Sequence, residues 1–369
     1  MEAAKGPTGL RQLLIGLGAY IQGTEVVTFG DTFEEYKTLQ SKNSALLIPL
    51  ISSAPLAIRG SDRIDFVNGQ VSNVVKELNI GGVNRSLLLD HRGHVQAEMS
   101  VLKHETEIFI AVENPGGILV ERGFNNHIVF DQVTVHNLQS KMCTFSLQGK
   151  GATRILEGLG ALPKQGYSYE GCIDGIEVLI YERARTASRG FDVHCKISDC
   201  EALLSGKFME HVSLGGVDAI QIARVEAGIP SVATEARNGA LPQEIELTKA
   251  VSFNKGCYLG QEIMARVDAR ARVNRGLAGV ILEKPPCSGE YRVENQGRSV
   301  GWLGHVVEHP IIGLIGLAVL RHDFPSGSEG NVGDSRVRRV EIPFEISTRQ
   351  KRFRLARWQQ FRIQNGKRP

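Results

Sequence analysis

Residues 254–262 read NKGCYLGQE, where a cysteine stands between two glycines with a lysine and a tyrosine beside it. Gly256 and Gly260 permit positive φ angles or a close backbone approach, and the residues after Gly260 predict a helix start. Cys257 would then lie near the positive end of that helix and close to Lys255, and both effects favour a thiolate. Two interpretations stay open here: a reactive or ligand-forming cysteine, and a buried neutral one.

A second notable stretch, ARVEAGIPSVATEARNGALPQE (223–244), places Arg224 and Glu226 two residues apart. On an extended segment these two side chains would share one face, and Gly-Ile-Pro after them predicts a turn. A glutamate held at such a turn can accept paired N–H bonds from a planar heterocycle. The alternative is an exposed Arg–Glu pair that ends a helix.

Length and composition describe an ordinary globular protein. The chain has 369 residues, 42% hydrophobic and 22% charged, which suggests two or three domains. No apolar run reaches the roughly 18 residues that a membrane span needs, and IIGLIGLAVL (311–320) is better interpreted as a buried strand. The N-terminus lacks the pattern of a secretory signal. We therefore expect a cytoplasmic bacterial protein without a membrane span.

The cysteines are scattered and include no CxxC pair. They stand at positions 143, 172, 195, 200, 257 and 287. Cys195 and Cys200, with His194 in HCKISDC, come closest to a metal cluster, but their spacing matches no common zinc pattern. The sequence therefore predicts reduced, mostly structural cysteines and no bound metal.

The charge is distributed unevenly. Residues 349–369 carry eight Lys or Arg and no acid, which leaves 35 basic against 40 acidic residues elsewhere. Arginines interleaved with aromatic residues can contact RNA or an anionic membrane. The plainer interpretation, which we favour, is a solvated extension that packs loosely on the body, with a weak RNA contact as the alternative.

The order of predicted elements indicates the fold class. RSLLLDHRGHVQAEMSVL (85–102) predicts a hairpin with its turn at DHRG, residues 107–126 predict a strand and then a helix, and 46–60 predict a pair of strands. Hairpins and helices without regular βαβ alternation predict an α+β fold. Beyond a boundary near 272–276, short strands with frequent Gly and Pro turns over 277–323 predict a small antiparallel barrel.

Together these stretches resemble a known family. KGCYLGQE (255–262) resembles the signature of the folate-binding YgfZ proteins and their mitochondrial counterparts, which act in iron–sulfur protein maturation. The resemblance covers roughly residues 25–345. Its other blocks are RGSDRIDFVNGQVSN (59–73), LLLDHRGHV (87–95), ARVEAGIP (223–230), LPQE (241–244), GRSVGWLGHVVEHPIIGLIGLAVLR (297–321) and VEIPF (340–344).

That family is similar in fold to the T-protein of glycine cleavage, an aminomethyltransferase. The resemblance implies three lobes around a channel for tetrahydrofolate or a folate derivative. It divides the chain into a folate-binding region of two interleaved α+β lobes (1–272), a C-terminal β-barrel domain (273–345) and a basic tail (346–369).

The resemblance also implies roles for particular residues. Carried over by position, Glu226 would bind the pterin ring, Arg224 would support it, and Asn73 and Tyr258 would line the channel. Lys255 and Cys257 are residues that this family shows and the aminomethyltransferases do not. The Cys257 thiol would engage a transient iron–sulfur cluster or a sulfur species, and the partners would be iron–sulfur client or assembly proteins.

The sequence departs from the aminomethyltransferases at one position of their chemistry. Those enzymes place a catalytic aspartate after the strand that corresponds to IFIAVENPGG, where this chain has Glu113, Asn114 and Pro115. The longer arm of a glutamate would displace the carboxylate by about an ångström, which matters for catalysis. The leading hypothesis is therefore a folate-binding factor for assembly or repair of iron–sulfur enzymes. The alternatives are a folate-dependent aminomethyltransferase or demethylase with Glu113 as base, and a non-catalytic folate sensor.

Overall fold

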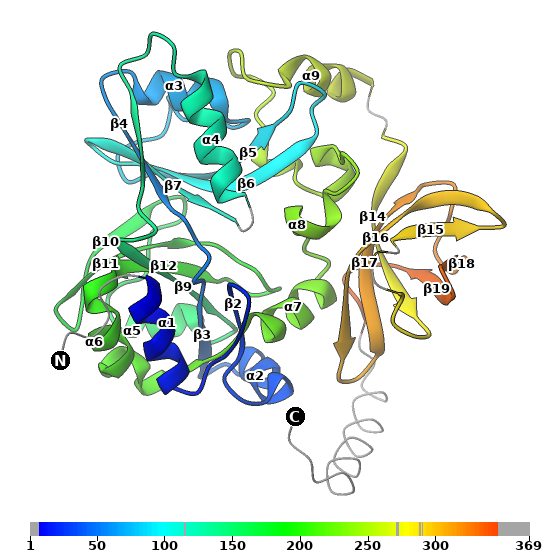
Figure 1. Ribbon diagram of the computed structural model, residues 1–369, viewed down its shortest axis with the longest axis horizontal. Coiled ribbons are helices and arrows are strands. Elements are labelled where there is room, and N and C mark those ends of the chain that lie inside the picture. Colours follow the sequence, from blue (N-terminus) through cyan, green and yellow to red (C-terminus); the bar gives the residue numbers. More distant parts are fainter. Residues whose placement is uncertain (1–6, 114–115, 271–272, 288, 290, 346–369) are drawn as a thin grey trace, which may run out of the picture.

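The computed structural model describes residues 7–113, 116–270, 273–287, 289 and 291–345, with side chains described up to residue 267 in the last helix before the barrel. The described chain forms three lobes: two α/β lobes, each built on its own sheet, and a C-terminal barrel (Figure 1). The basic segment 349–369, with its expected RNA contact, lies outside the described residues.

The strands belong to a hairpin, two sheets and a barrel. The hairpin is β1 (Tyr20–Gln22) and β2 (Glu25–Thr28). The six-stranded sheet has the order β10 (Ser168–Ile173), β11 (Ile176–Glu182), β12 (Phe191–Lys196), β9 (Met142–Gln148), β3 (Ala45–Pro49) and β13 (Val212–Leu214). The five-stranded sheet has the order β5 (Val83–Leu89), β6 (Val95–Lys103), β7 (Glu107–Val112), β4 (Leu56–Arg59) and β8 (Thr134–Asn137). The closed barrel has the order β14 (Arg275–Leu282), β17 (Gly313–Arg321), β16 (Arg298–His309), β15 (Arg292–Asn295), β18 (Glu329–Val332) and β19 (Ser335–Val340).

The helices are short and cover the sheets or connect the lobes. They are α1 (Pro7–Gly16), α2 (Thr32–Leu39), α3 (Arg63–Gln70), α4 (Gly117–His127), α5 (Ala152–Gly158), α6 (Cys200–Ser205), α7 (Val217–Glu226), α8 (Val232–Glu235) and α9 (Gln261–Arg270). Single 3₁₀ turns span Ile197–Asp199, Lys207–His211, Pro242–Ile245 and Thr248–Ala250. No helix of the described chain is long and apolar enough to cross a membrane.

The two α/β lobes are interleaved along the chain. After β3 the chain leaves the six-stranded sheet, builds the five-stranded sheet from β4 to β8, and returns with β9, which pairs with β3. The prediction that 46–60 forms two strands is confirmed, but the expectation that they pair is wrong, because β4 pairs with β7 and β8. Both strands are almost entirely buried, and a short apolar run does not encode which sheet it joins.

The hairpin predicted over 85–102 is confirmed, with its turn at Asp-His-Arg-Gly. β5 and β6 are antiparallel, with Leu88 opposite Ala97. The Asp90 carboxylate accepts the backbone N–H groups of Arg92 and His94 at 2.8 Å each. Gly93 has φ +76°, which favours glycine. The predicted strand and helix over 107–126 are also present, as β7 and α4.

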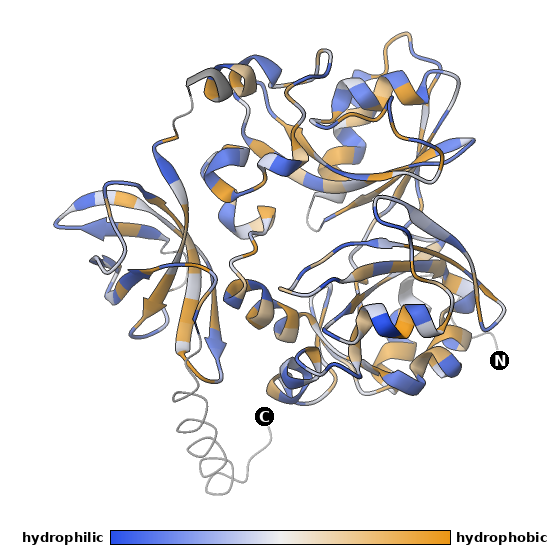
Figure 2. Ribbon diagram, turned by 180° about the vertical axis from the view of Figure 1, so that it is seen from behind, coloured by the Kyte–Doolittle hydropathy of each residue, from blue (hydrophilic) through white to orange (hydrophobic). Residues whose placement is uncertain are grey.

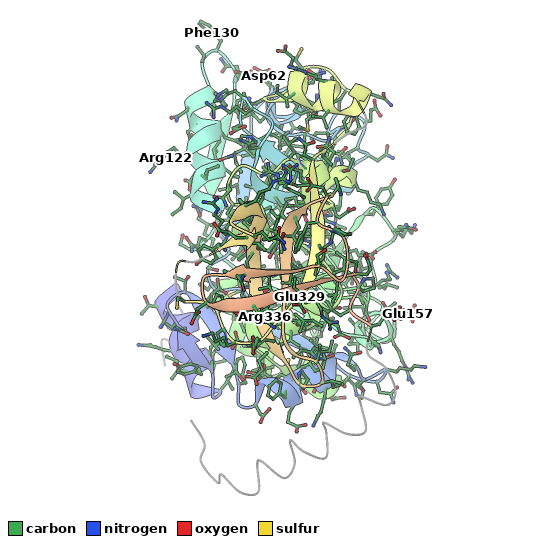
Figure 3. All side chains as sticks on the ribbon, turned by 90° about the vertical axis from the view of Figure 1, so that its right-hand side faces the viewer. Asp62, Arg122, Phe130, Glu157, Glu329 and Arg336 are labelled. Carbon is green, nitrogen blue, oxygen red and sulfur yellow. A yellow bond between two sulfur atoms is a disulfide. The ribbon has the colours of Figure 1, made fainter. Side chains whose placement is uncertain are left out.

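The predicted barrel is confirmed, and it packs on the body through an apolar core. Ile48 of β3, Val225 of α7 and Trp302 and Ile315 of the barrel belong to one buried cluster. The helices α7, α8 and α9 follow one another in the space between the two sheets and the barrel (Figure 1). Apolar residues gather along the sheets and inner helix faces (Figure 2). Seen from the barrel's side, Glu329 and Arg336 lie on its outer surface (Figure 3).

The cysteines of the six-stranded lobe correct one prediction. Cys143 of β9 and Cys200 at the start of α6 form a disulfide, so the expectation of reduced cysteines is wrong for this pair. Cys195 lies opposite Cys143 in the sheet, with its Sγ 3.9 Å from the Sγ of Cys200. Burial raises the pKa of Cys195 to about 12, so this third sulfur is a thiol rather than the thiolate that binds metal. Sequence spacing could not show the pairing because Cys143 and Cys200 are 57 residues apart in the chain.

Candidate functional site

A cavity of about 470 Å³ lies where the three lobes meet, within the usual size range of small-molecule sites. The sheets contribute β5, β6, β7, β9 and β12, the connecting segment contributes α7 and α8, and the barrel contributes His305 of β16. Its charged and polar lining comprises Glu25, Ser52, Ser53, Arg85, Glu98, Glu113, Thr144, Arg183, Arg185, Asp192, Asp218, Gln221, Arg224, Ser231, Thr234 and His305.

One end of the cavity is a network of buried ion pairs. Arg183 contacts both carboxylate oxygens of Glu98, at 3.0 and 2.9 Å, and Arg85 donates to the same carboxylate from Nε at 2.8 Å. Burial alone would raise the pKa of Glu98, but the two guanidinium groups lower it to about 2. Glu98 is therefore ionised throughout the physiological range.

Glu113, the predicted alternative base, belongs to the same network. It follows β7, and its Oε1 accepts hydrogen bonds from Arg183 Nε at 2.9 Å and Arg185 Nη2 at 2.5 Å. Arg185 also pairs with Asp192 of β12. These contacts hold the Glu113 carboxylate in one orientation at the cavity wall. Asn114 and Pro115, which follow it, lie outside the described residues.

Arg224 of α7 forms the other end. Its Nε donates to Gln221 at 2.7 Å, and its Nη1 donates to the carbonyl of Ile229 at 2.6 Å and to Glu235 at 3.1 Å. Its Nη2 is buried and has no hydrogen-bond partner within the described chain. A buried donor without an acceptor costs free energy, and Arg224 is one of the residues that line the cavity.

Of the two interpretations of Arg224 and Glu226, the structure shows the helix end and not the shared face, although Arg224 is buried and not exposed. The segment is helical through Glu226 rather than extended, and helical residues two apart point to different sides. The Glu226 carboxylate accepts a hydrogen bond from the Tyr36 hydroxyl at 2.6 Å and lies 3.7 Å from His309 Nε2 of the barrel. Glu226 is not among the residues that line the cavity.

The structure confirms the predicted helix start in KGCYLGQE, and it places the Lys255 ammonium over the Tyr258 ring, 5.1 Å from the ring centroid. Gly260 has φ +83°, and a Cβ there would lie 2.6 Å from the Asp90 carbonyl, so the hairpin turn packs against this glycine. Cys257 is exposed, whereas Tyr258 is buried. Burial raises the pKa of the Tyr258 phenol to about 12.

Lys255 has a different set of contacts from the one predicted. Its ammonium donates to the backbone carbonyls of Asn68, Val71 and Asn73 at 2.5, 2.7 and 2.8 Å. Burial lowers the pKa of Lys255 to about 8, so the ammonium still predominates at pH 7. Its three N–H donors are matched by three acceptors.

The remaining predicted residue, Asn73, donates from its side chain to the Arg85 carbonyl at 2.8 Å. Six site residues were predicted. Among the described residues that line the cavity, Arg224 is the one predicted residue present. Sequence reasoning missed the ion-pair network. Its available signal was the alternation of Arg183 and Arg185 directly after an apolar strand, which puts both guanidinium groups on one face.

Comparison with known proteins identifies the class. Residues 31–255 match the family described as the GCVT N-terminal domain, and the chain belongs to this family. An aminomethyltransferase of Geobacillus sp. (strain WCH70) is 22% identical over 309 residues, which cover 81% of this chain and 84% of the relative. An aminomethyltransferase of Bacillus cereus (strain B4264) is 24% identical over 342 residues, which cover 88% and 92%.

A solved structure supports the fold. The crystal structure of glycine cleavage system aminomethyltransferase T from Bartonella henselae matches with a TM-score of 0.76 at 18% identity, covering 91% of this chain and 97% of that chain. The three-lobed T-protein-like fold with a closed C-terminal barrel is thus confirmed. The finer resemblance to the YgfZ proteins stays a prediction.

Proposed function

We propose that this protein binds tetrahydrofolate, or a folate derivative, in the 470 Å³ cavity and transfers a one-carbon unit in the manner of an aminomethyltransferase. The observation that carries the proposal is Arg224, which lines a cavity between the three lobes and whose buried Nη2 has no partner among the described residues. Membership of the GCVT N-terminal domain family and the names of the relatives support the same reading.

The lining suits a flat heterocycle with a polar edge. Apolar side chains such as Val112, Ile220 and Val232 supply surfaces for a ring. Arg224 offers a donor, and Asp218 offers a carboxyl whose pKa is raised by burial and by the charge of Glu35. Tetrahydrofolate, when bound, supplies nitrogen atoms that carry the one-carbon unit.

Glu113 is the proposed proton acceptor. Arg183 and Arg185 hold its Oε1, which keeps the carboxylate oriented before substrate arrives. Both arginines donate to Oε1, so proton transfer in this proposal uses Oε2. The ion pairs of Glu98 and Asp192 behind it keep the two arginines in place.

The first test combines binding and turnover. Purified protein is titrated with tetrahydrofolate, and one-carbon transfer from an aminomethyl-lipoyl carrier is measured. Arg224→Lys keeps a cation beside Glu235 but removes the Nη2 donor, so we expect about tenfold weaker tetrahydrofolate binding. Absence of saturable binding to the wild type would contradict the proposal.

A second candidate function rests on Cys257, which is exposed and outside the cavity lining, within reach of a protein partner. In this reading the protein is a folate-binding factor for assembly or repair of iron–sulfur enzymes. One thiol is too few for a self-contained cluster, which takes about four protein ligands, so the cluster would be transient and shared with a client protein.

One pair of variants separates the two candidates. An aminomethyltransferase retains transfer activity in Cys257→Ala and loses it in Glu113→Gln. A maturation factor shows the reverse in cells that lack the endogenous protein: client iron–sulfur enzymes stay inactive with Cys257→Ala and recover with Glu113→Gln. Tetrahydrofolate binding is measured for both variants, so that loss of the ligand is not mistaken for loss of function.

A further inference from the structure

A second cavity, of about 510 Å³, lies between the barrel and the segment around 238–244, away from the proposed folate site. It is lined by Asn238, Glu244, Asn274, Arg275, Arg292, Ser299, Gly301, Trp302 and Arg321. A neighbouring hollow of about 270 Å³ shares Glu244, Asn274 and Arg275 with it and adds Arg92 and His94. The 510 Å³ cavity and the 470 Å³ cavity have no lining residue in common.

Three arginines, from the barrel strands β14, β15 and β17, line this cavity. Arg275 begins β14 and lies directly opposite Arg321 at the end of β17, and Arg292 begins β15 opposite Trp302 of β16. Like charges directly opposite each other on paired strands destabilise a sheet. The end of the barrel where β14 begins faces α8 and α9 (Figure 1). Arg275, Arg292 and Arg321 therefore line one recess at this end of the barrel.

Arg275 is held in position before any ligand arrives. Its Nε donates at 2.9 Å to Glu244, which is buried and also accepts the backbone N–H of Leu241 at 3.0 Å. Its guanidinium lies over the Trp302 ring at 4.6 Å. The described ion pair uses Nε, which leaves the two Nη groups of this planar fork for a ligand.

The other hydrogen-bond donors that line this cavity are two further arginine side chains, two carboxamides and a hydroxyl group. Arg292 pairs with Glu294 through Nε at 3.0 Å, and Arg321 pairs with Asp323 through Nε and Nη2 at 2.9 and 3.0 Å. Neither carboxylate lines the cavity, and Glu244 is the single acid among its lining residues. Two carboxamides and a serine hydroxyl complete the set. Such a wall offers many donors and a net positive charge.

We propose that this cavity binds a phosphorylated small molecule, with its phosphate on Arg275, Arg292 and Arg321. A phosphate carries about −1.5 to −2 charge at pH 7 and three acceptor oxygens, which suits donors that arrive from three strands. A carboxylate offers half that charge and two oxygens. The volume exceeds that of the phosphate, so room remains for an organic part.

Pyrophosphate and inorganic phosphate are the probes, titrated calorimetrically into the full chain at constant ionic strength. We expect saturable binding to one site. Arg292→Gln and Arg321→Gln each remove a charged donor and should weaken binding by about tenfold or more. Both side chains are partly exposed, at 66% and 36%, so these variants are expected to fold.

Arg298→Gln is the matched control, because Arg298 is an exposed barrel arginine that pairs with Asp323 but does not line the cavity. Its pyrophosphate affinity should stay within about twofold of the wild type. The proposal is overturned if the wild type shows no saturable binding at millimolar concentrations, or if Arg298→Gln weakens binding as much as Arg292→Gln. Tetrahydrofolate affinity should be unchanged in Arg292→Gln, which keeps this test separate from the proposed function.

Discussion

At the scale of single residues, the contacts of Lys255 favour a structural role over control of the Cys257 thiol. A lysine two positions from a cysteine suggests control of the thiol, but the Lys255 ammonium is bound by the carbonyls of Asn68, Val71 and Asn73. These carbonyls belong to the C-terminal part of α3 and the residues after it, where helical carbonyls lack partners. The lysine therefore ties the KGCYLGQE segment to the five-stranded lobe.

The first residue-scale prediction concerns stability. Lys255→Met removes three charge-assisted hydrogen bonds and leaves three carbonyls without their donor, so the free energy of unfolding should fall by about 2–4 kcal/mol. Urea denaturation at pH 7 measures it. Lys249→Met, at an exposed lysine in the same region, is the control and should change stability by less than about 0.5 kcal/mol.

The same variant tests the link between Lys255 and Cys257. Because the ammonium is engaged by carbonyls, the alkylation rate of Cys257 at pH 7 should change by less than about twofold in Lys255→Met. Peptide mapping distinguishes Cys257 from the exposed Cys172 and Cys287. A fall of about tenfold or more would show that the lysine ionises the thiol, since one pKa unit corresponds to a factor of ten in thiolate at that pH.

At the scale of elements, the sequence predicted what nearby residues encode. The 85–102 hairpin follows from its Asp-His-Arg-Gly turn, and the start of α9 follows from Gly260. By contrast, the spacing of Arg224 and Glu226 alone fits either an extended segment or a helix end. The apolar Ile220, Ala223 and Val225 give the helix α7 its buried face. The Cys143–Cys200 bond and the ion pairs around Glu98 join distant strands, and their partners depend on sheet order.

Sheet pairing also buries a histidine whose charge state affects stability. His194 of β12 is fully buried, with Thr144 Oγ1 3.1 Å from its Nδ1 and the Tyr181 hydroxyl 3.1 Å from its Nε2. Burial lowers the pKa of His194 from 6.5 to about 4. The nearby Asp192 carboxylate acts in the opposite direction, because it favours the charged imidazolium. The unfolded chain therefore takes up a proton between pH 6.5 and 4 that the folded chain does not.

This difference in proton uptake between the unfolded and folded chains predicts how stability depends on pH. The free energy of unfolding should decrease as pH falls from 6.5 to 4, by at most about 1.4 kcal/mol per pH unit for one proton. His194→Gln should reduce this slope without abolishing it, because the pKa of His305 is also lowered to about 4 by burial. Urea titrations at several pH values measure the slope. The exposed His91→Gln is the control, and an equal reduction there would refute the assignment.

At the scale of the whole molecule, the barrel is joined to the body by a buried hydrogen-bond cluster as well as by apolar packing. His309 Nδ1 accepts the backbone N–H groups of Ile311 and Ile312 at 3.2 Å each. Its proton therefore sits on Nε2, which faces the Tyr36 hydroxyl at 3.2 Å. Tyr36 in turn donates to Glu226, so α2, α7 and β16 meet at this cluster.

Loss of the central hydroxyl should loosen this attachment. Tyr36→Phe removes the 2.6 Å donor to a carboxylate in a largely buried setting, and we expect a loss of about 1–3 kcal/mol in stability. Hydrogen exchange should quicken in β16 and α7 before the five-stranded sheet is affected. Tyr20→Phe, at an exposed tyrosine of the β1–β2 hairpin, is the control and should leave both quantities unchanged.

The arrangement of the three lobes also separates Glu226 from Arg224, which the family resemblance treated as one ligand-binding pair. Glu226 contacts Tyr36 and lies near His309, whereas Arg224 lines the cavity, and its buried Nη2 has no hydrogen-bond partner within the described chain. Glu226→Gln should therefore lower stability and leave tetrahydrofolate affinity within about twofold of the wild type, while Arg224→Lys weakens it about tenfold. Calorimetric titration of both variants, with their unfolding curves, distinguishes the cases. A tenfold loss of affinity in a well-folded Glu226→Gln would restore this glutamate to the folate site and place the ring nearer to the barrel.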